Sequence, residues 1–211
     1  MINDELLYYS EQHSSAESDI LYKIHRETYI KMPFPRMLSG HLQGRFLSMI
    51  SKLTAPKAIL EIGTFTGYSA ICLAEGLEKQ GVIHTIEINP ELEDLLNDNF
   101  TKAGITDRVK LYIGSALKII PDLKEEFNLI FLDADKENYL EYYHLVFDKL
   151  KSGGLLLADN TLWGGKILSK AHSGDFETNS IQIFNDFVAK DNRVEKLLLP
   201  FRDGITMIRK L

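Results

Sequence analysis

Acidic and amide side chains follow two apolar runs of this sequence, where predicted strands end. Asp133 follows residues 129–132, and Asp159 and Asn160 follow residues 154–158. Ligands of open α/β sheets bind beyond the carboxyl ends of the strands, so these three side chains are expected to converge. Two carboxylates that close repel each other unless a cation joins them. Hard oxygen donors favour Mg²⁺, or another divalent cation such as Mn²⁺ or Ca²⁺, whereas zinc prefers histidine and cysteine. The alternative is that each aspartate only caps the helix after it.

A second cluster begins where residues 58–69 predict a buried strand, a glycine turn and a helix. Gly63 and Gly67 allow a sharp turn against which a ligand can lie, and the helix amides point toward that ligand. The spacing G-x-x-x-G differs from the dinucleotide fingerprint G-x-G-x-x-G, and Glu61 would repel a pyrophosphate. A carboxylate suits an ammonium group, so S-adenosylmethionine fits, because it has an ammonium and no phosphate. The alternative is that the glycines serve packing alone.

Glu87 ends the next predicted strand, 24 residues after Gly63. A carboxylate at this position can accept hydrogen bonds from both ribose hydroxyls of a nucleoside. A solvated acid at a strand end is the alternative interpretation.

The elements that must position these residues alternate between helix and strand, which predicts right-handed βαβ units. The predicted fold class is α/β, a three-layer αβα arrangement around a mostly parallel seven-stranded sheet. Five strands form its parallel part, and a hairpin joined at Asp203-Gly204 closes one edge. Strands are expected at 58–62, 82–87, 109–113, 129–132, 154–158, 194–199 and 205–208, and helices at 67–79, 90–103, 116–120, 137–150 and 180–189.

The N-terminal segment 1–50 is expected to be helical and to precede the core 57–211. Residues 4–30 predict helix, with a helix start near residues 14–17, and Pro33 and Pro35 interrupt it before a second amphipathic helix. The apolar residues of this segment must be covered by the parent domain or by a second copy of the chain. The sequence therefore predicts a homodimer.

Length and composition limit the class of protein. A chain of 211 residues with 45% hydrophobic content suits a single domain, 1–211. The net charge of −6 without a basic cluster makes nucleic acid an unsuitable partner. The apolar runs fall short of the roughly 20 residues that span a membrane, and the acidic start Met1–Leu6 does not resemble a signal peptide. One cysteine, Cys72, excludes an internal disulfide and favours a cytoplasmic protein.

Three segments of the sequence resemble a known family. Residues 61–69 (EIGTFTGYS), 131–139 (FLDADKENY) and 153–164 are similar to the signature segments of the cation-dependent class I O-methyltransferases, the group that includes caffeoyl-CoA and catechol O-methyltransferases. The resemblance extends from about Ser14 to Lys210 and includes residues 203–206. It implies a Rossmann-like methyltransferase fold and methyl transfer from S-adenosylmethionine to one oxygen of a small phenolic substrate, a vicinal diphenol.

The resemblance also implies residue roles. Cofactor contacts would come from Met37, Glu61, Gly63, Tyr68, Ser69, Glu87, Gly114, Ser115, Ala116 and Asp133. The metal would be held by Asp133, Asp159 and Asn160. Catalysis would depend on Lys136, as the base, and on Asp133. The substrate would contact Lys136, Asn160 and Trp163, whose ring could form an aromatic wall.

Lys136 has a chemical reason to act as a base. A divalent cation lowers the pKa of a hydroxyl that it binds, and a lysine amine nearby can then accept the proton. The alternative is a surface lysine paired with Asp135 or Glu137. Two other classes of protein stay open: a non-catalytic nucleotide-binding module, and a nicotinamide oxidoreductase, which the missing G-x-G-x-x-G disfavours.

Three positions depart from the pattern of this family. Pro35 and Met37 stand where other members carry aromatic or polar gate residues, and Arg202 stands where a small residue commonly precedes the Asp-Gly turn. The identity of the phenol is therefore not predicted by the resemblance.

Overall fold

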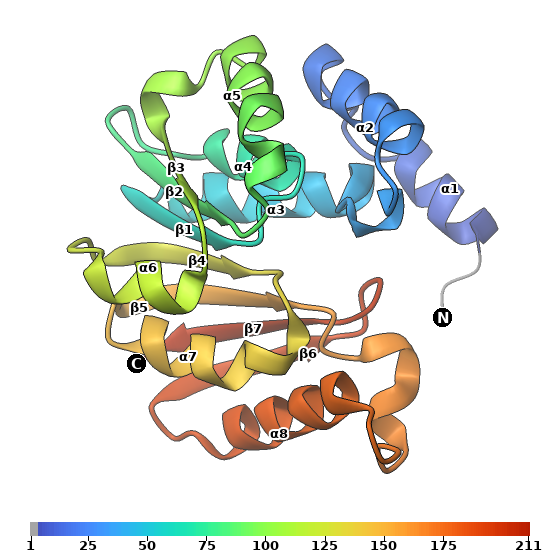
Figure 1. Ribbon diagram of the computed structural model, residues 1–211, viewed down its shortest axis with the longest axis vertical. Helices are drawn as coiled ribbons and strands as arrows, with labels where there is room; N and C mark the ends of the chain where they lie inside the picture. The colour runs from blue at the N-terminus through green and yellow to red at the C-terminus, as the bar shows by residue number, and fades with distance from the viewer. Residues whose placement is uncertain (1–3) are drawn as a thin grey trace.

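Seven strands form a continuous sheet in the computed structural model, which describes residues 4–211. The order is β3-β2-β1-β4-β5-β7-β6. Strands β1 to β5 are parallel, and β7 is antiparallel to both β5 and β6. The predicted parallel sheet with a closing hairpin is confirmed (Figure 1). The strands are β1 Ala58–Ile62, β2 Val82–Glu87, β3 Val109–Ile113, β4 Phe127–Leu132, β5 Leu150–Asp159, β6 Val194–Leu199 and β7 Ile205–Lys210.

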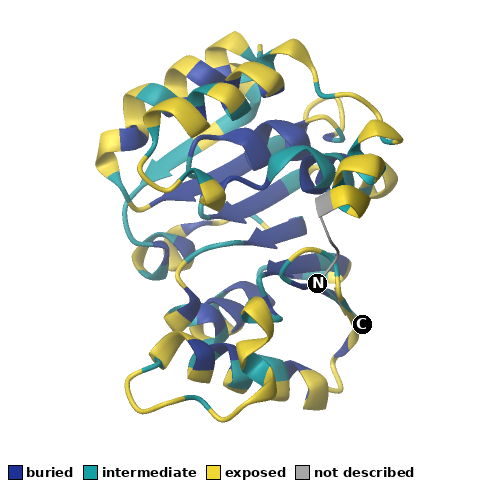
Figure 2. Cartoon of the chain, turned by 90° about the vertical axis from the view of Figure 1, so that its right-hand side faces the viewer, coloured by how far each residue is buried: buried dark blue, intermediate teal, exposed yellow. Residues whose placement is uncertain are grey.

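Helices cover both faces of the sheet, as the three-layer prediction requires. In β1, Leu60 and Ile62 point into one core cluster and Ile59 into the other, because successive side chains of a strand point to opposite faces. The first cluster contains residues of α6 Ala116–Asp122, α7 Tyr139–Phe147 and α8 Phe176–Lys190. The second contains residues of α2 Asp19–Lys31, α3 Gly40–Thr54, α4 Tyr68–Ala74 and α5 Glu93–Lys102. The central strands β1, β2 and β4 are largely buried between these layers, whereas β3 and β6 at the two edges are more exposed (Figure 2).

The N-terminal segment differs from its prediction in one respect. Instead of one helix over 4–30 there are two, α1 Asp4–Gln12 and α2, separated by residues 13–18. The cap of α2 is Ser18, whose hydroxyl accepts a hydrogen bond from the amide of Leu21. The helix start expected near residues 14–17 is therefore shifted toward Asp19. Residues 1–3, part of the acidic start, lie outside the described residues.

Helix α4 is shorter than predicted and ends at Ala74 instead of near Lys79. Gly76 lies so close to α3 that a Cβ atom there would be 2.2 Å from the carbonyl carbon of Ser51. The chain leaves the helix at this close contact and turns toward β2. Because this contact joins two separate segments, helical propensity alone could not locate it.

No helix among the described residues, 4–211, is both long enough and apolar enough to cross a membrane.

Candidate active site

A pocket of about 830 Å³ opens at the carboxyl ends of the parallel strands. Its walls include the residues that follow β1, β2, β4 and β5, together with the segment 33–39 that precedes α3. Pockets of this size, at this place in an open α/β sheet, bind small molecules and cofactors. The predicted site residues that line it are Met37, Gly63, Tyr68, Ser69, Glu87, Gly114, Ala116, Asp133, Lys136, Asp159, Asn160 and Trp163.

The glycine turn after β1 shapes one end of this pocket. Gly63 has φ +96°, and a Cβ atom there would lie 2.0 Å from the carbonyl oxygen of Asp133. Only glycine allows the loops after β1 and β4 to approach so closely. Gly67, at φ +84°, precedes the first residue of α4. Packing thus explains the glycine at position 63, while its backbone still lines the pocket.

Glu87 lies at the end of β2 and holds two loops in place. Its Oε2 accepts a hydrogen bond from the amide of Phe65 at 2.8 Å, and its Oε1 accepts one from the amide of Asn89 at 2.9 Å. The side chain is buried yet lines the pocket. Each carboxylate oxygen can accept more than one hydrogen bond, so Glu87 has capacity left for ligand hydroxyls.

Glu61 is fully buried in β1 and does not line the pocket wall. Its Oε2 accepts a hydrogen bond from the hydroxyl of Thr85 at 2.5 Å, whereas its Oε1 has no partner among residues 4–211. Burial raises the pKa of Glu61 to about 8, although the hydroxyls of Ser69 and Thr85 oppose this. An unpartnered buried carboxylate oxygen beside the pocket fits a cationic group, such as an ammonium.

Most of the other predicted cofactor residues lie on the pocket wall. Tyr68, Ser69, Gly114, Ala116 and the exposed Met37 all line the pocket, but Ser115 does not. The hydroxyl of Tyr68 donates to Glu17, in the turn before α2. This contact joins the N-terminal segment to the helix that follows the glycine turn.

The three predicted metal ligands lie on the same pocket wall. Asp133 and Asp159 follow the paired strands β4 and β5, and Asn160 adopts φ +56°, an uncommon conformation for a residue other than glycine. Burial, followed by the charge of Asp133, raises the pKa of Asp159. A cation would relieve this repulsion, so the donor set fits a hard divalent ion. Across residues 4–211 no three His, Cys, Asp or Glu side chains are grouped to hold a metal, so the third protein ligand would be the Asn160 amide.

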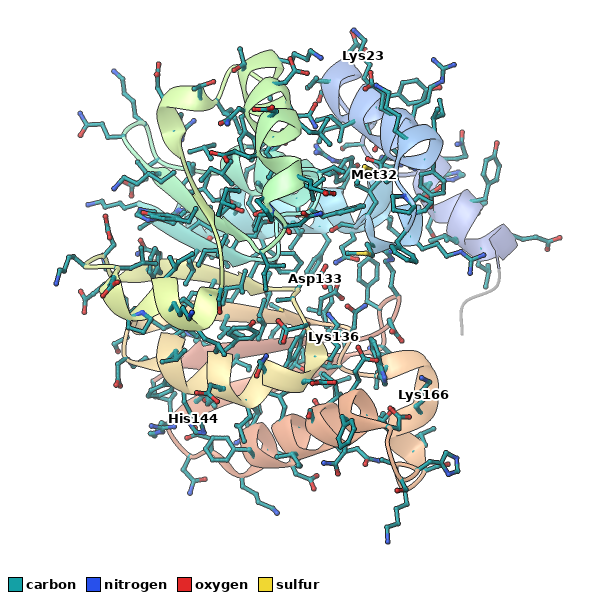
Figure 3. The ribbon with its side chains drawn as sticks, viewed as in Figure 1. Lys23, Met32, Asp133, Lys136, His144 and Lys166 are labelled. Carbon is teal, nitrogen blue, oxygen red and sulfur yellow. The ribbon has the colours of Figure 1, made fainter. Side chains whose placement is uncertain are left out.

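Lys136 is buried and is not a surface lysine paired with Asp135 or Glu137. Its Nζ donates hydrogen bonds to Asp133 Oδ1 at 3.0 Å and to the hydroxyl of Tyr139 at 2.7 Å. Figure 3 shows Asp133 and Lys136 close together near the middle of the molecule, away from the labelled Lys23 and His144. The amine therefore lies beside the candidate metal ligands, on the wall of the pocket.

Trp163 is half-buried and lines the pocket, with φ +46°. Its indole Nε1 is buried and has no hydrogen-bond partner among the described residues. Strained backbone at both Asn160 and Trp163 is typical of a functional site, because other contacts must hold such conformations in place.

Three residues with contacts in this site were not predicted to act there. Tyr139 lies one helical turn after Lys136, and its hydroxyl donates to the carbonyl oxygen of Asp159 at 3.0 Å. That spacing was a signal in the sequence. Gln43 donates to Asp159 Oδ2 at 2.6 Å, and Arg202 donates to Gln43. Arg202 is singled out in the sequence only as a departure before the Asp-Gly turn, and no local pattern connects it or Gln43 to Asp159, since the partners lie far apart along the chain.

The sheet order, its antiparallel last strand and the pocket at the strand ends together define a Rossmann-like methyltransferase. The chain belongs to the O-methyltransferase family, whose model matches residues 11–211. Caffeoyl-CoA O-methyltransferase 1 of Eucalyptus globulus is 37% identical over 198 residues, which cover 88% of this chain and 80% of that protein. The corresponding protein of Zea mays is 35% identical, covering 88% and 76%.

Solved structures agree with this family. The SAH-bound methyltransferase PaMTH1 of Podospora anserina has a TM-score of 0.91 and 31% identity, covering 100% of this chain and 97% of that one. The O-methyltransferase of Bacillus cereus in complex with SAH has a TM-score of 0.89 and 28% identity, covering 96% of each chain. The resemblance noted in the three signature segments is confirmed. Family membership also sets aside the non-catalytic module and the nicotinamide oxidoreductase.

Proposed function

We propose that this O-methyltransferase transfers the methyl group of S-adenosylmethionine to one hydroxyl of a vicinal diphenol, with a divalent cation bound. One observation carries the proposal: the carboxylates of Asp133 and Asp159 line one pocket together with the buried amine of Lys136. This arrangement supports the proposal because a cation held by the two carboxylates would bind two adjacent oxygens beside an amine that would accept a proton.

The cofactor end of the pocket supports S-adenosylmethionine. The Glu61 carboxylate suits the ammonium group of the cofactor, and the carboxylate of Glu87 suits its ribose hydroxyls. Related structures with SAH, the demethylated product, support the same ligand class for this chain. Ser115 contributes no side chain to the pocket, so the loop 114–116 would act through Gly114 and Ala116.

A divalent cation held by Asp133, Asp159 and Asn160 would lower the pKa of a diphenol hydroxyl and orient both oxygens. Lys136 would then accept the hydroxyl proton on Nζ. Tyr139 holds this amine in place, and burial raises the pKa of Tyr139 well above its ordinary value, so its hydroxyl keeps its proton. Trp163 supplies an apolar surface for the ring of the substrate.

Two further proposals concern the state of the protein. Aromatic and aliphatic side chains on the outer surface of α1 and α2 favour a homodimer; those exposed by more than half are Leu6, Tyr8, Tyr9, Tyr22, Tyr29 and Ile30.

A single thiol, that of Cys72, favours a reducing compartment such as the cytoplasm. Burial raises the pKa of this thiol to about 12, so it stays protonated.

The experiment is methyl transfer from isotope-labelled S-adenosylmethionine to catechol, with and without a chelator. We expect transfer to catechol in the presence of Mg²⁺, loss of transfer with the chelator, and recovery when Mg²⁺ is restored. Resorcinol, whose hydroxyls are not adjacent, is the matched control and should accept little methyl. A rate of methyl transfer that the chelator does not change, or equal rates with both phenols, would contradict the proposal.

A further inference from the structure

A chain of hydrogen bonds connects three distant segments beside the candidate metal ligands, buried at Gln43 and Asp159 and exposed at Arg202, which also lines the pocket. Arg202, in the turn between β6 and β7, donates through Nη1 to Oε1 of Gln43. Gln43, in the first turns of α3, donates through Nε2 to Oδ2 of Asp159 at 2.6 Å. Asp159, at the end of β5, lines the pocket, whereas Gln43 lies behind it. The chain thus leads from a surface turn to one of the three candidate ligands.

Arg202 and Asp159 hold the Gln43 amide in one orientation from its two sides. A guanidinium group only donates hydrogen bonds, so the amide oxygen faces Arg202. An ionised carboxylate only accepts, so the amide nitrogen faces Asp159. Without the arginine, the amide oxygen would lose its donor, and the side chain would be free to turn away from Asp159. Arg202 therefore helps to keep Gln43 against the carboxylate.

Burial makes the hydrogen bond between Gln43 and Asp159 difficult to replace. Gln43 is 1% exposed and Asp159 is 3% exposed, so water has little access to replace a lost hydrogen bond. The other carboxylate oxygen, Oδ1, accepts from the amide of Asn160 at 2.8 Å. With one donor on each oxygen, the plane of the carboxylate is held in one orientation, and each oxygen keeps a lone pair for a cation.

Arg202 also contacts the backbone of the pocket segment that precedes α3. Its Nη1 donates to the carbonyl oxygen of Ser39, and its Nη2 donates to that of Leu38 at 3.4 Å. The backbone at Arg202 has φ +51°, a conformation that needs other contacts to hold it. These contacts keep the turn against the start of α3, where Gln43 lies.

We infer that Gln43, oriented by Arg202, is a positioning residue that sets the direction of the Asp159 carboxylate for a divalent cation. This inference rests on the proposed function, because it assumes a cation at Asp133, Asp159 and Asn160. Hydrogen bonds behind a metal ligand typically change metal affinity by 10- to 100-fold when they are removed. Gln43 itself does not touch the cation.

The test is the affinity of Mn²⁺ for the whole protein without cofactor or substrate, measured by calorimetry and by electron paramagnetic resonance. Gln43→Leu, which keeps the shape and removes the amide, should weaken Mn²⁺ by roughly 10- to 100-fold. Arg202→Met should weaken it as well, but should have no further effect when Gln43 is already leucine. Arg202→Lys, which keeps a group that only donates, should restore most of the affinity. The affinity for S-adenosylmethionine should stay within a few fold.

Arg209→Met is the matched control, because Arg209 lies on the same hairpin and pairs with Glu195 at the surface, away from the pocket. It should bind Mn²⁺ like the unaltered protein. Unchanged affinity in both Gln43→Leu and Arg202→Met would overturn the inference while leaving the proposed function intact. Additive losses from the two substitutions would overturn the link between them. If the unaltered protein does not bind Mn²⁺, the proposed metal site and this inference both fail.

Discussion

The amine of Lys136 donates a hydrogen bond to Asp133 Oδ1 across 3.0 Å, from the first residue of the short 3₁₀ helix Lys136–Asn138 back to the loop that follows β4. Both line the pocket, so one carboxylate faces a lysine and a candidate cation position at once. In the proposed mechanism, Asp133 would stabilise the ammonium that forms when the Lys136 amine accepts the substrate proton, and the following prediction tests that transfer.

Lys136→Arg separates proton transfer from charge attraction. Arginine keeps the positive charge but cannot be deprotonated in proteins, so the maximal rate should fall by roughly 10²- to 10⁴-fold at neutral pH. Part of the loss should return as pH rises, because hydroxide can then remove the proton. The measurement is the maximal rate against pH for both proteins.

Lys110→Arg is the control for this substitution, since Lys110 pairs with Glu125 away from the pocket. Its rate should equal that of the unaltered protein. Nearly equal rates for Lys136→Arg at pH 7 would rule out a base at position 136 and leave only an attractive role.

Asp159→Ala should abolish metal-dependent turnover while the affinity for S-adenosylmethionine stays within a few fold. Asp159 faces the candidate metal position, and no predicted cofactor contact depends on it. Calorimetry with Mn²⁺ and with the cofactor, run separately, measures both effects. Asp148→Ala, at an exposed residue after α7, is the control. An equal loss of cofactor affinity would show that Asp159 contributes to cofactor binding, against its assignment to the metal alone.

Glu87→Ala should weaken S-adenosylmethionine by roughly 1–3 kcal/mol, because ribose hydroxyls lose a charged acceptor. The amides of Phe65 and Asn89 also lose their acceptor, so thermal unfolding must be measured beside the dissociation constant. Mn²⁺ affinity should be preserved. A dissociation constant that does not change would show that another residue holds the ribose.

Glu61→Gln should make stability less dependent on pH. Burial raises the pKa of Glu61 from 4.5 to about 8, so the folded protein holds this proton more tightly than the unfolded chain. The resulting stabilisation is complete below about pH 4.5 and is lost as pH rises toward 8, by at most about 1.4 kcal/mol per pH unit. Glutamine removes this contribution. Urea unfolding at pH 5.5, 6.5 and 7.5 without cofactor should therefore give a smaller decline for the variant, and parallel declines would refute the assignment.

The outer face of α2 predicts the oligomeric state. Tyr29 and Ile30 are exposed by 55% and 66%, and a two-fold dimer would cover such residues in both copies. One chain has a mass of 24.0 kDa, and light scattering at micromolar concentration should give twice that value. Ile30→Glu should shift the mass toward one chain, whereas Leu168→Glu, at a residue 85% exposed elsewhere, should not. A monomer in the unaltered protein would disprove the dimer.

The sequence was sufficient for the sheet and the hairpin, and most of the site residues that it predicted line the pocket. Strands such as 58–62 and 154–158 are recognisable because burial on both faces requires short apolar runs, and their order along the chain implies parallel pairing. Asp133, Asp159 and Glu87 were recognisable because polar residues directly after such runs must meet at one edge of the sheet.

Tertiary structure alone decided the features that depend on contacts between distant segments. It placed Glu61 beneath the pocket wall, left Ser115 out of the pocket, ended α4 at the close approach of Gly76, and joined Gln43 to Asp159 across 116 positions. Local periodicity records which face of an element is buried, but not which partner meets a given side chain. That choice depends on how separate segments pack, so the support behind the Asp159 carboxylate is visible only in the folded chain.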